Sequence, residues 1–207
     1  MSKMKFSLIA AMLIMVMAAS AQVNLGIKGG VNMSNFLADE LNDKGIKIGF
    51  NVGLSADFDF SSNSALQTGL FLTTKGAKYS ASFGSVSADY TVNPIYLQLP
   101  VHYAYKIDVT PGTRIVFHAG PYAAYGVAGK MKLKGSVGDY SGEKDEKLFG
   151  DDKSLKPFDA GLGLGAGVEL GSIVLDLGWD MGLVNISNVS NGDIKNQNAY
   201  LSVGYKF

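Results

Sequence analysis

The chain contains no cysteine among its 207 residues, and this absence limits how the fold can be stabilised. Disulfides contribute nothing, so a small secreted domain held together by disulfides is excluded. A lipoprotein anchor is also excluded, because it requires a cysteine directly after the leader. Histidine is scarce too, with only His102 and His118, which leaves few candidates for acid–base chemistry.

Long apolar runs are the second absence. Beyond the N-terminus, no segment has the roughly 18 uninterrupted apolar residues of a membrane-spanning helix. Yet 47% of the residues are hydrophobic and only 17% are charged. High hydrophobic content without a helical span suits a transmembrane β-barrel, and also a soluble β protein with a large core. The chain has no excess of basic residues, so its charge does not indicate nucleic acid or an anionic membrane surface as a partner.

The N-terminus contains the pattern of a secretory signal. Two lysines within the first five residues form a positive region, residues 6–17 form a short apolar region, and Ala19-Ser20-Ala21 is a small-residue cleavage site. We therefore expect residues 1–21 to be a signal peptide and residues 22–207 to be the mature chain. Without the two leader lysines, 16 basic residues face 18 acidic ones, a net charge of about −2.

The most regular pattern runs from Ile46 to Phe60, where apolar and polar residues alternate without a break. A period of two is that of a β-strand, whose successive side chains point to opposite faces of the sheet. The run is longer than an ordinary strand of about five or six residues. It exceeds the roughly 9–11 residues that cross a bilayer at a tilt. Its wholly apolar face suits lipid, and its other face suits a polar lumen.

Eight such segments predict an all-β fold, an eight-stranded antiparallel up-and-down transmembrane β-barrel. They span residues 23–34, 46–60, 64–78, 88–106, 113–128, 157–170, 173–185 and 197–207. The connections alternate between short and long, and the long ones cover residues 35–45, 79–87, 129–156 and 186–196. Outer-membrane barrels have short periplasmic turns and long extracellular loops, so this alternation predicts an outer-membrane location with both termini in the periplasm.

Aromatic residues end three of the predicted strands on the periplasmic side. They predict an interfacial girdle formed by Phe58, Phe60, Tyr103, Tyr105, Tyr205 and Phe207. The last strand, which ends on an aromatic residue, also resembles the signal recognised by the outer-membrane barrel assembly machinery. We therefore expect that machinery, outer-membrane lipid and lipopolysaccharide as partners.

The polar faces of the predicted strands carry charges of both signs. We expect these residues to face the lumen: Lys28, Lys47, Arg114, Lys206, Asp57, Asp59, Glu169, Asp176 and Asp180. The interior of an eight-stranded barrel is just wide enough to be filled by side chains. Mixed charges in so narrow a space should pair and plug it, so no wide pore is expected.

Four segments share a characteristic order and spacing. They are residues 26–36 (GIKGGVNMSNF), residues 96–101 (YLQLPV), Gly120-Pro121-Tyr122 with residues 160–170, and residues 204–207 (GYKF). Together they resemble the PorT-like outer-membrane β-barrel family of the Bacteroidota, small barrels of OmpA/OmpX-type architecture. The resemblance implies an outer-membrane barrel. It implies no catalytic, cofactor-binding or metal-binding residue, because that family mostly lacks an assigned activity.

Residues 161–167 contain the G-x-G-x-x-[GA] spacing of a dinucleotide-binding loop, in Gly161, Gly163 and Ala166. That loop requires a preceding strand and a following helix. Here the glycines recur at every second position and no helical pattern follows, so we interpret them as one face of a strand. The sequence therefore predicts no nucleotide or other cofactor.

The two histidines fall on the lumen faces of neighbouring predicted strands. A turn centred near Thr110 places His102 directly opposite His118, where Cβ atoms are about 4.5–5.5 Å apart. Such a pair can share a proton or bind a metal. Because no third ligand is indicated, we interpret the histidines as polar side chains that fill the lumen, and predict no metal site.

The segment 129–156 has the densest charge of the chain. Its acidic residues lack the spacing of a calcium-binding loop, so we interpret it as a solvated loop. The alternation from Lys130 to Lys134 predicts that the strand continues beyond the membrane as a hairpin arm. Such an arm can bind an extracellular partner, such as lipopolysaccharide phosphates or a host surface.

The function predicted from these features is a structural or surface-interaction role in the outer membrane, without catalytic residues. Two alternatives remain open. An outer-membrane lipid-modifying enzyme would need a nucleophile, a base and an orienting acid within hydrogen-bond reach. A soluble lipocalin-like carrier would turn its apolar faces inward, around a ligand cavity.

Overall fold

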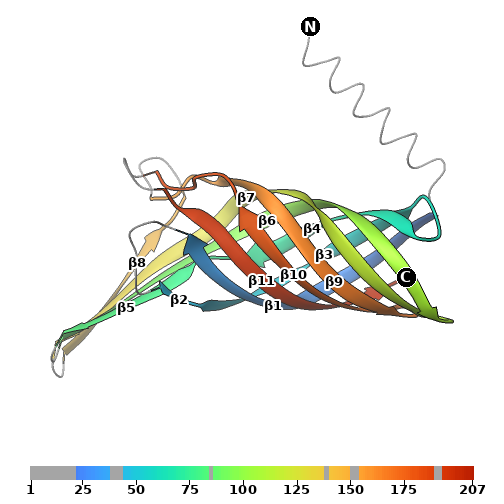
Figure 1. The fold of residues 1–207 in the computed structure, drawn as a ribbon. Helices are drawn as coiled ribbons and strands as arrows, with labels where there is room; N and C mark the ends of the chain where they lie inside the picture. Colours follow the sequence, from blue (N-terminus) through green and yellow to red (C-terminus); the bar gives the residue numbers. More distant parts are fainter. Residues whose placement is uncertain (1–21, 38–43, 84–85, 138–139, 150–153, 189–192) are drawn as a thin grey trace, which may run out of the picture.

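The computed structural model describes residues 22–37, 44–83, 86–137, 140–149, 154–188 and 193–207 (Figure 1). The predicted signal peptide, residues 1–21, lies outside the described residues. The described part of the chain contains no helix that is long and apolar enough to span a membrane.

The described residues form β-strands joined by turns and short irregular segments. The strands are β1 (Gln22–Leu37), β2 (Lys44–Gly45), β3 (Lys47–Asp59), β4 (Ser64–Thr74), β5 (Ala77–Phe83), β6 (Val86–Thr110), β7 (Thr113–Val137), β8 (Tyr140–Lys147), β9 (Phe158–Leu170), β10 (Ile173–Gly182) and β11 (Lys195–Lys206).

Eight of these strands close into a ring, in the order β1-β3-β4-β6-β7-β9-β10-β11. The ring closes where β11 returns to β1, in a ladder from Gly26↔Lys206 to Leu37↔Lys195. Every pairing in the ring is antiparallel. Closure matters because an open strand edge in lipid leaves backbone N–H and C=O groups without partners. The predicted eight-stranded antiparallel barrel is confirmed.

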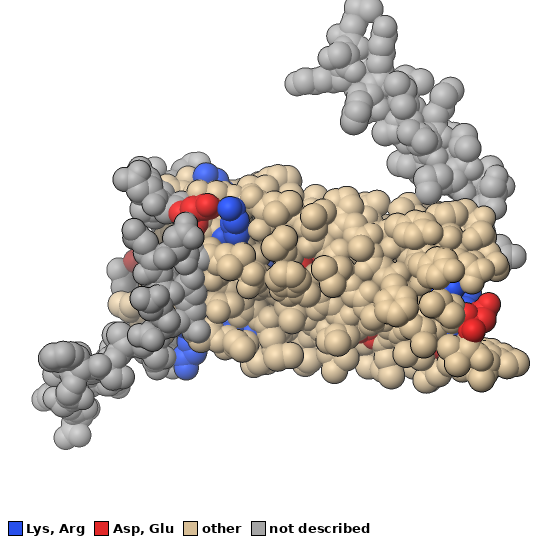
Figure 2. Space-filling view, viewed as in Figure 1, with Lys and Arg blue, Asp and Glu red and all other residues tan. Residues whose placement is uncertain are grey.

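The wall is apolar outside and polar inside, as the alternation predicts. In β3, Ile48 is 66% exposed and its neighbour Lys47 only 9%. Figure 2 shows a barrel wall that is almost free of charged residues between its two ends. The soluble lipocalin-like alternative is therefore wrong, because it requires the opposite orientation.

The predicted aromatic girdle lies at the end of the barrel where the turn after β3 and the C-terminus are found. Phe60 and Tyr103 have ring centroids 6.2 Å apart, and those of Tyr205 and Phe207 are 6.0 Å apart. These four rings and Tyr105 are exposed, whereas Phe58 is partly buried. Two further exposed aromatics, Tyr125 and Phe158, pair between β7 and β9 towards the other end.

Strands extend where two long loops were predicted. Residues 79–87 were expected to be a loop, but β5 and β6 pair as far as Phe83↔Val86. In the predicted loop 129–156, β7 continues to Val137 and pairs with β8, as far as Val137↔Tyr140. The predicted hairpin arm is thus confirmed, and it contains more strands than expected, because β5 and β6 pair alongside β7 and β8. We call β5, β8 and the outer parts of β6 and β7 the arm; β5 and β8 project from the end opposite the C-terminus in Figure 1.

The predicted strand 64–78 is interrupted, and this interruption separates the barrel wall from the arm. β4 ends at Thr74 and β5 begins at Ala77. Between them Gly76 has a φ of 121°, in the region that favours glycine because it has no Cβ. Three successive residues, Thr73, Thr74 and Lys75, are buried here, so the period of two fails locally.

The two surroundings of the strands can be distinguished by substitution. Leu177 in the middle of β10 is 56% exposed, so Leu177→Arg should destabilise the barrel by about 2–4 kcal/mol if its surroundings are hydrocarbon. Leu133 in the arm is 47% exposed, and Leu133→Arg should change stability by no more than about 0.5 kcal/mol in water. Denaturant unfolding in lipid vesicles measures both, and equal costs would contradict the assignment.

Candidate functional site

The charged residues of the lumen form separate layers, and the first lies towards the girdle end. Lys206 Nζ lies 2.6 Å from Asp57 Oδ2 and 2.5 Å from Glu169 Oε1. Lys106 Nζ lies 2.7 Å from Asp59 Oδ1, and Arg114 Nη2 lies 3.0 Å from Glu169 Oε2. This group, which we call the inner ion cluster, joins β3, β6, β7, β9 and β11 across the lumen.

The second layer contains both histidines, in a different register from the predicted one. Ala104, not His102, is the partner of His118. The β6–β7 turn forms at Pro111-Gly112, just beyond the predicted centre at Thr110, and this shifts the pairing by two residues. The rings are therefore diagonal neighbours. They still stack, with centroids 5.1 Å apart and 3.0 Å between their Nδ1 atoms.

The hydrogen bonds of the histidine pair fix its proton positions when both rings are neutral. His118 Nε2 lies 2.9 Å from Asp176 Oδ1, so it carries the proton and donates to the carboxylate. His118 Nδ1 then accepts a hydrogen bond from His102 Nδ1. The Nε2 of His102 is left with a lone pair. Lys28, whose Nζ lies 3.3 Å from Asp176 Oδ2, completes this layer.

The glycines of residues 161–167 make room for these rings. A Cβ on Gly165 would lie 2.6 Å from His118 Nε2, and a Cβ on Gly163 would lie 2.8 Å from His102 Nε2. β9 continues through the glycines to Leu170 without a helix. The strand interpretation is therefore confirmed, and the resemblance to a dinucleotide loop comes from glycines that accommodate imidazoles.

The third layer lies where β4 gives way to β5. Lys75 is fully buried, and its Nζ lies 3.0 Å from Asp159 Oδ2. The ammonium group is also 4.1 Å from the centroid of the Tyr122 ring, close enough for a cation–π interaction. Asn196 Nδ2 donates to the same carboxylate oxygen over 2.9 Å. We call Lys75 and Asp159 the outer ion pair.

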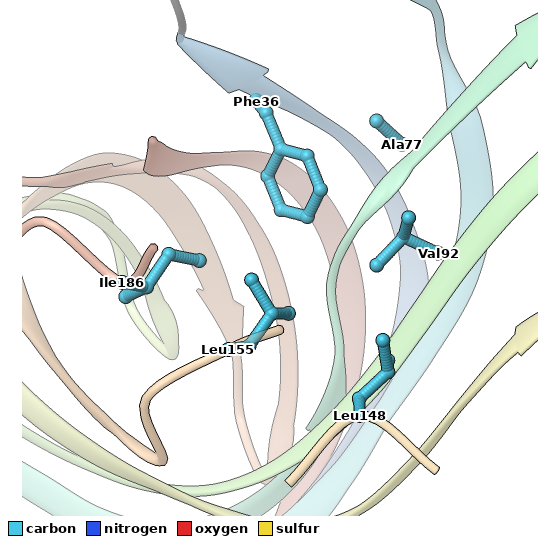
Figure 3. Close-up of a cluster of buried hydrophobic side chains, with 6 residues drawn as sticks. All are labelled: Phe36, Ala77, Val92, Leu148, Leu155 and Ile186. Atoms are coloured by element: carbon cyan, nitrogen blue, oxygen red, sulfur yellow. The ribbon is translucent and has the colours of Figure 1, made fainter. Parts of the chain in front are cut away.

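An apolar cluster lies at the root of the arm, at the outer mouth of the barrel (Figure 3). Phe36 at the end of β1 meets Ala77 of β5 and Val92 of β6. Side chains from the two segments after β8 and β10 complete it: Leu148, Leu155 and Ile186. We call this group the outer cluster. An isolated bridge between Leu155 and Ser187 links those segments.

A cavity of about 70 Å³ remains in the lumen. It is lined by Lys28, Asn32, Asn51, Asp57, Gln67, Thr68, Phe71, Thr73, Gln98, Pro100, His102, His118, Asp176, Asp180, Asn198, Tyr200 and Ser202. At roughly 10–15 Å³ per water, this space holds about five waters.

The opposite face of the arm carries lysines. Ala77, Val92 and Met131 contribute to the outer cluster, so the alternate residues of the same strands point away from the barrel axis. Two registered rows contain these outward residues, Lys78–Thr91–Lys132 and Asn93–Lys130–Lys147. All four lysines are exposed. We call them the lysine rows.

Sequence reasoning found most of the buried charged residues of the lumen but missed three. All nine predicted charged residues lie on the lumen side of their strands. Lys106 and Asp159 were missed although the alternation of their strands places them inward. Lys75 had no such signal, because the strand pattern breaks at Gly76. Among the described residues, no group of three His, Cys, Asp or Glu side chains is placed to hold a metal ion.

Comparison with known proteins agrees with this geometry. Residues 17–188 match the family model of the outer membrane protein beta-barrel domain. The chain belongs to this family. The family assignment and the fold therefore agree that this is an outer-membrane protein. No curated protein shows significant sequence similarity to it.

Several solved structures are similar to the outer-membrane barrel. Ail of Yersinia pestis is 17% identical (90% of this chain and 99% of that chain covered, TM-score 0.44). The Neisserial surface protein NspA is 14% identical (90% and 99%, TM-score 0.45). OprG of Pseudomonas aeruginosa is 14% identical (90% and 97%, TM-score 0.44).

The outer ion pair should be costly to break from one side only. Lys75→Met leaves Asp159 charged and buried, so we expect a loss of about 3–5 kcal/mol in unfolding free energy. Lys75→Met combined with Asp159→Asn should recover most of that loss, because no charge is left unpaired. Denaturant unfolding of the refolded barrel gives both values.

The control is Lys195→Met, which breaks the surface pair between Lys195 and Asp193. An exposed pair contributes at most about 1 kcal/mol. If Lys75→Met costs no more than Lys195→Met, the outer ion pair is not shielded from water.

Proposed function

We propose that the protein is a closed outer-membrane barrel that conducts no solute and presents the arm as an interaction surface outside the cell. The observation that carries this proposal is the succession of contacts along the lumen. The inner ion cluster, the histidine layer and the outer ion pair each connect parts of the barrel that are not neighbours in the ring. The outer cluster then covers the mouth with side chains that exclude water.

The outer cluster distinguishes this barrel from an open channel. A water-filled mouth would be lined by polar side chains, because apolar groups exposed to water are unfavourable. Here Phe36, Leu148, Leu155 and Ile186 are each at most 4% exposed. Three of them, Leu148, Leu155 and Ile186, come from two connecting segments rather than from strands. These segments therefore fold over the lumen and leave the outward face of the arm for partners.

The lysine rows indicate the chemistry of the first partner. On β7 they follow Tyr125 and Val127, the last exposed apolar residues of the wall before the arm. Lys130 is three residues beyond Val127, which is about 10 Å along a strand. Cations at this height face the headgroup region of the outer leaflet. We therefore propose that they bind the phosphates of lipopolysaccharide, with the remainder of the arm extending further outward.

The patterns at the two ends of the chain concern its export and its insertion into the outer membrane. We propose that residues 1–21 direct export and are removed, and that β11, with its terminal Tyr205 and Phe207, is recognised by the barrel assembly machinery. PorT-like membership is a finer proposal within the outer-membrane barrel family, supported by residues 96–101, which contribute the buried Tyr96 and Gln98 to the lumen.

A lipid-modifying enzyme is the second candidate, and the position of the histidines argues against it. His102 and His118 lie inside the lumen and bond to each other and to Asp176. Neither ring forms a hydrogen bond with a Ser or Thr hydroxyl among the described residues. Substrate lipid on the outer face of the wall would be separated from them by the sheet.

Neutralising the lysine rows tests the proposed partner. Lys130→Gln with Lys147→Gln removes two cations, each contributing about 1 kcal/mol to attraction by anionic lipid. We expect binding of the refolded barrel to vesicles that contain bisphosphorylated lipid A to weaken by roughly 30-fold. Vesicles of dephosphorylated lipid A should bind wild type and variant equally.

The matched control is Glu146→Gln, which removes one charge from the same hairpin. Glu146 of β8 lies opposite Met131 of β7 in the strand register. This variant should bind phosphorylated vesicles at least as well as wild type. Loss of binding in Glu146→Gln, or unchanged binding in the double lysine variant, would contradict the proposed role of the lysine rows.

A further inference from the structure

One row of residues across four strands leaves a gap in the lumen between a histidine and an aspartate. His102 of β6 lies beside Gly120 of β7, whose Cβ would be 2.8 Å from the Cα of His102. Gly120 pairs with Gly163 of β9, and Gly163 pairs with Asp180 of β10. Two adjacent glycines thus separate His102 from Asp180, and no side chain stands between them.

The functional atoms of these two residues converge above Gly163. A Cβ built on Gly163 would lie 2.7 Å from Asp180 Oδ1 and 2.8 Å from His102 Nε2. The two atoms are therefore separated by no more than the sum of these distances, 5.5 Å. Both residues also line the lumen cavity.

Asp180 differs from the other buried acids of the described lumen in having no ion-pair partner within 4 Å. Asp57, Asp159, Glu169 and Asp176 each have a Lys, Arg or His nitrogen within 4 Å. The hydrogen-bond donor to Asp180 is an amide, Gln98 Nε2, at 2.9 Å. A carboxylate that is only 2% exposed is costly without a positive partner.

His102 supplies the second ligand atom and is already oriented for that role. Its Nε2 has no hydrogen-bond partner in the described protein, although the residue is only 5% exposed. When both rings are neutral, its Nδ1 donates to His118, which in turn donates to Asp176. Metal-binding histidines typically donate their other ring N–H to such a partner, which fixes the tautomer and makes the ligand more basic.

Two amide oxygens of the same cavity also lack partners in the described protein, Gln98 Oε1 and Asn198 Oδ1. Gln98 is tied to Asp180 through its amide nitrogen, and Asn198 pairs with Asp180 between β10 and β11. All the unpartnered atoms that line this cavity can act as acceptors. Such a set suits a ligand that is positively charged.

We propose that His102 Nε2 and Asp180 Oδ1 bind one divalent cation of the zinc type in the lumen. The imidazole nitrogen selects such an ion over Mg²⁺ and Ca²⁺, which prefer oxygen ligands alone. Gln98, Asn198 and water are the candidates for the remaining positions. The bound ion supplies the positive charge that Asp180 lacks, and joins β6 to β10 across two glycines.

Zinc retention by the untagged, refolded barrel tests this site. Refolding in detergent with Zn²⁺ gives the ion access to the lumen before the barrel closes. After gel filtration in metal-free buffer, elemental analysis should find about one zinc per wild-type chain. Excess Mg²⁺ during refolding should not reduce this amount, and X-ray absorption should show an imidazole nitrogen in the zinc shell.

Three variants should lose the retained zinc: His102→Gln, Asp180→Asn and Gly163→Ala. The first two remove a ligand atom, and the third fills the gap between the ligands. His118→Ala should weaken zinc affinity by about 10–100-fold, because it removes the group that orients His102. Gly29→Ala is the matched control, since its Cβ would meet its nearest atom, Asn51 O, at 3.6 Å, an ordinary contact.

Heat-modifiable electrophoretic mobility shows which variants have folded, and only folded protein is compared. The proposal is overturned if folded wild type retains no zinc. It is also overturned if folded His102→Gln and Asp180→Asn each retain as much zinc as wild type and Gly29→Ala. Should Gly163→Ala not fold, the two ligand variants and the spectrum of the wild-type site still decide the outcome.

Discussion

The fold depends on how charge is accommodated inside a barrel of eight strands. The interior of an eight-stranded barrel is just wide enough for side chains to fill, so a buried ammonium or carboxylate is stabilised by a partner on another strand. Lys206 of β11 therefore meets Asp57 of β3 and Glu169 of β9. These contacts join residues far apart in the sequence, and removing one partner leaves a charge without compensation. The lumen thus specifies which strands face one another, in addition to the backbone ladders of the wall.

The space that these groups require explains the many glycines of the lumen face. His102 and His118 fit because Gly163 and Gly165 carry no side chains, and Gly178 does the same for the ring of Tyr200. Because bulky polar groups alternate with glycine inside the barrel, the width of the lumen is not uniform. At its outer end the polar filling gives way to the outer cluster, and the opposite face of the arm carries the lysine rows.

Much of this architecture could be predicted from the sequence, because a period of two reports directly which side chains face lipid and which face the lumen. Strand number, wall orientation, girdle and the charged lumen followed from that period. The predictions failed where the period stops. Lys75 turns inward at Gly76, where the chain leaves the β pattern. The histidine register was misplaced by two residues, because it depends on where the turn at Pro111-Gly112 forms. The outer cluster was invisible, because Leu148, Leu155 and Ile186 come from segments with no periodicity.

The central claim, a lumen closed by paired charges and the outer cluster, is tested most directly by ion conductance across planar lipid bilayers. Vesicle flotation first shows that the refolded barrel has inserted, and the same preparation is then fused with the bilayer. The proposed closed lumen predicts current no greater than that of protein-free bilayers at moderate voltage. Stable, discrete conductance steps from wild-type protein would contradict it, because they require a continuous aqueous path through the inner ion cluster, the outer ion pair and the outer cluster.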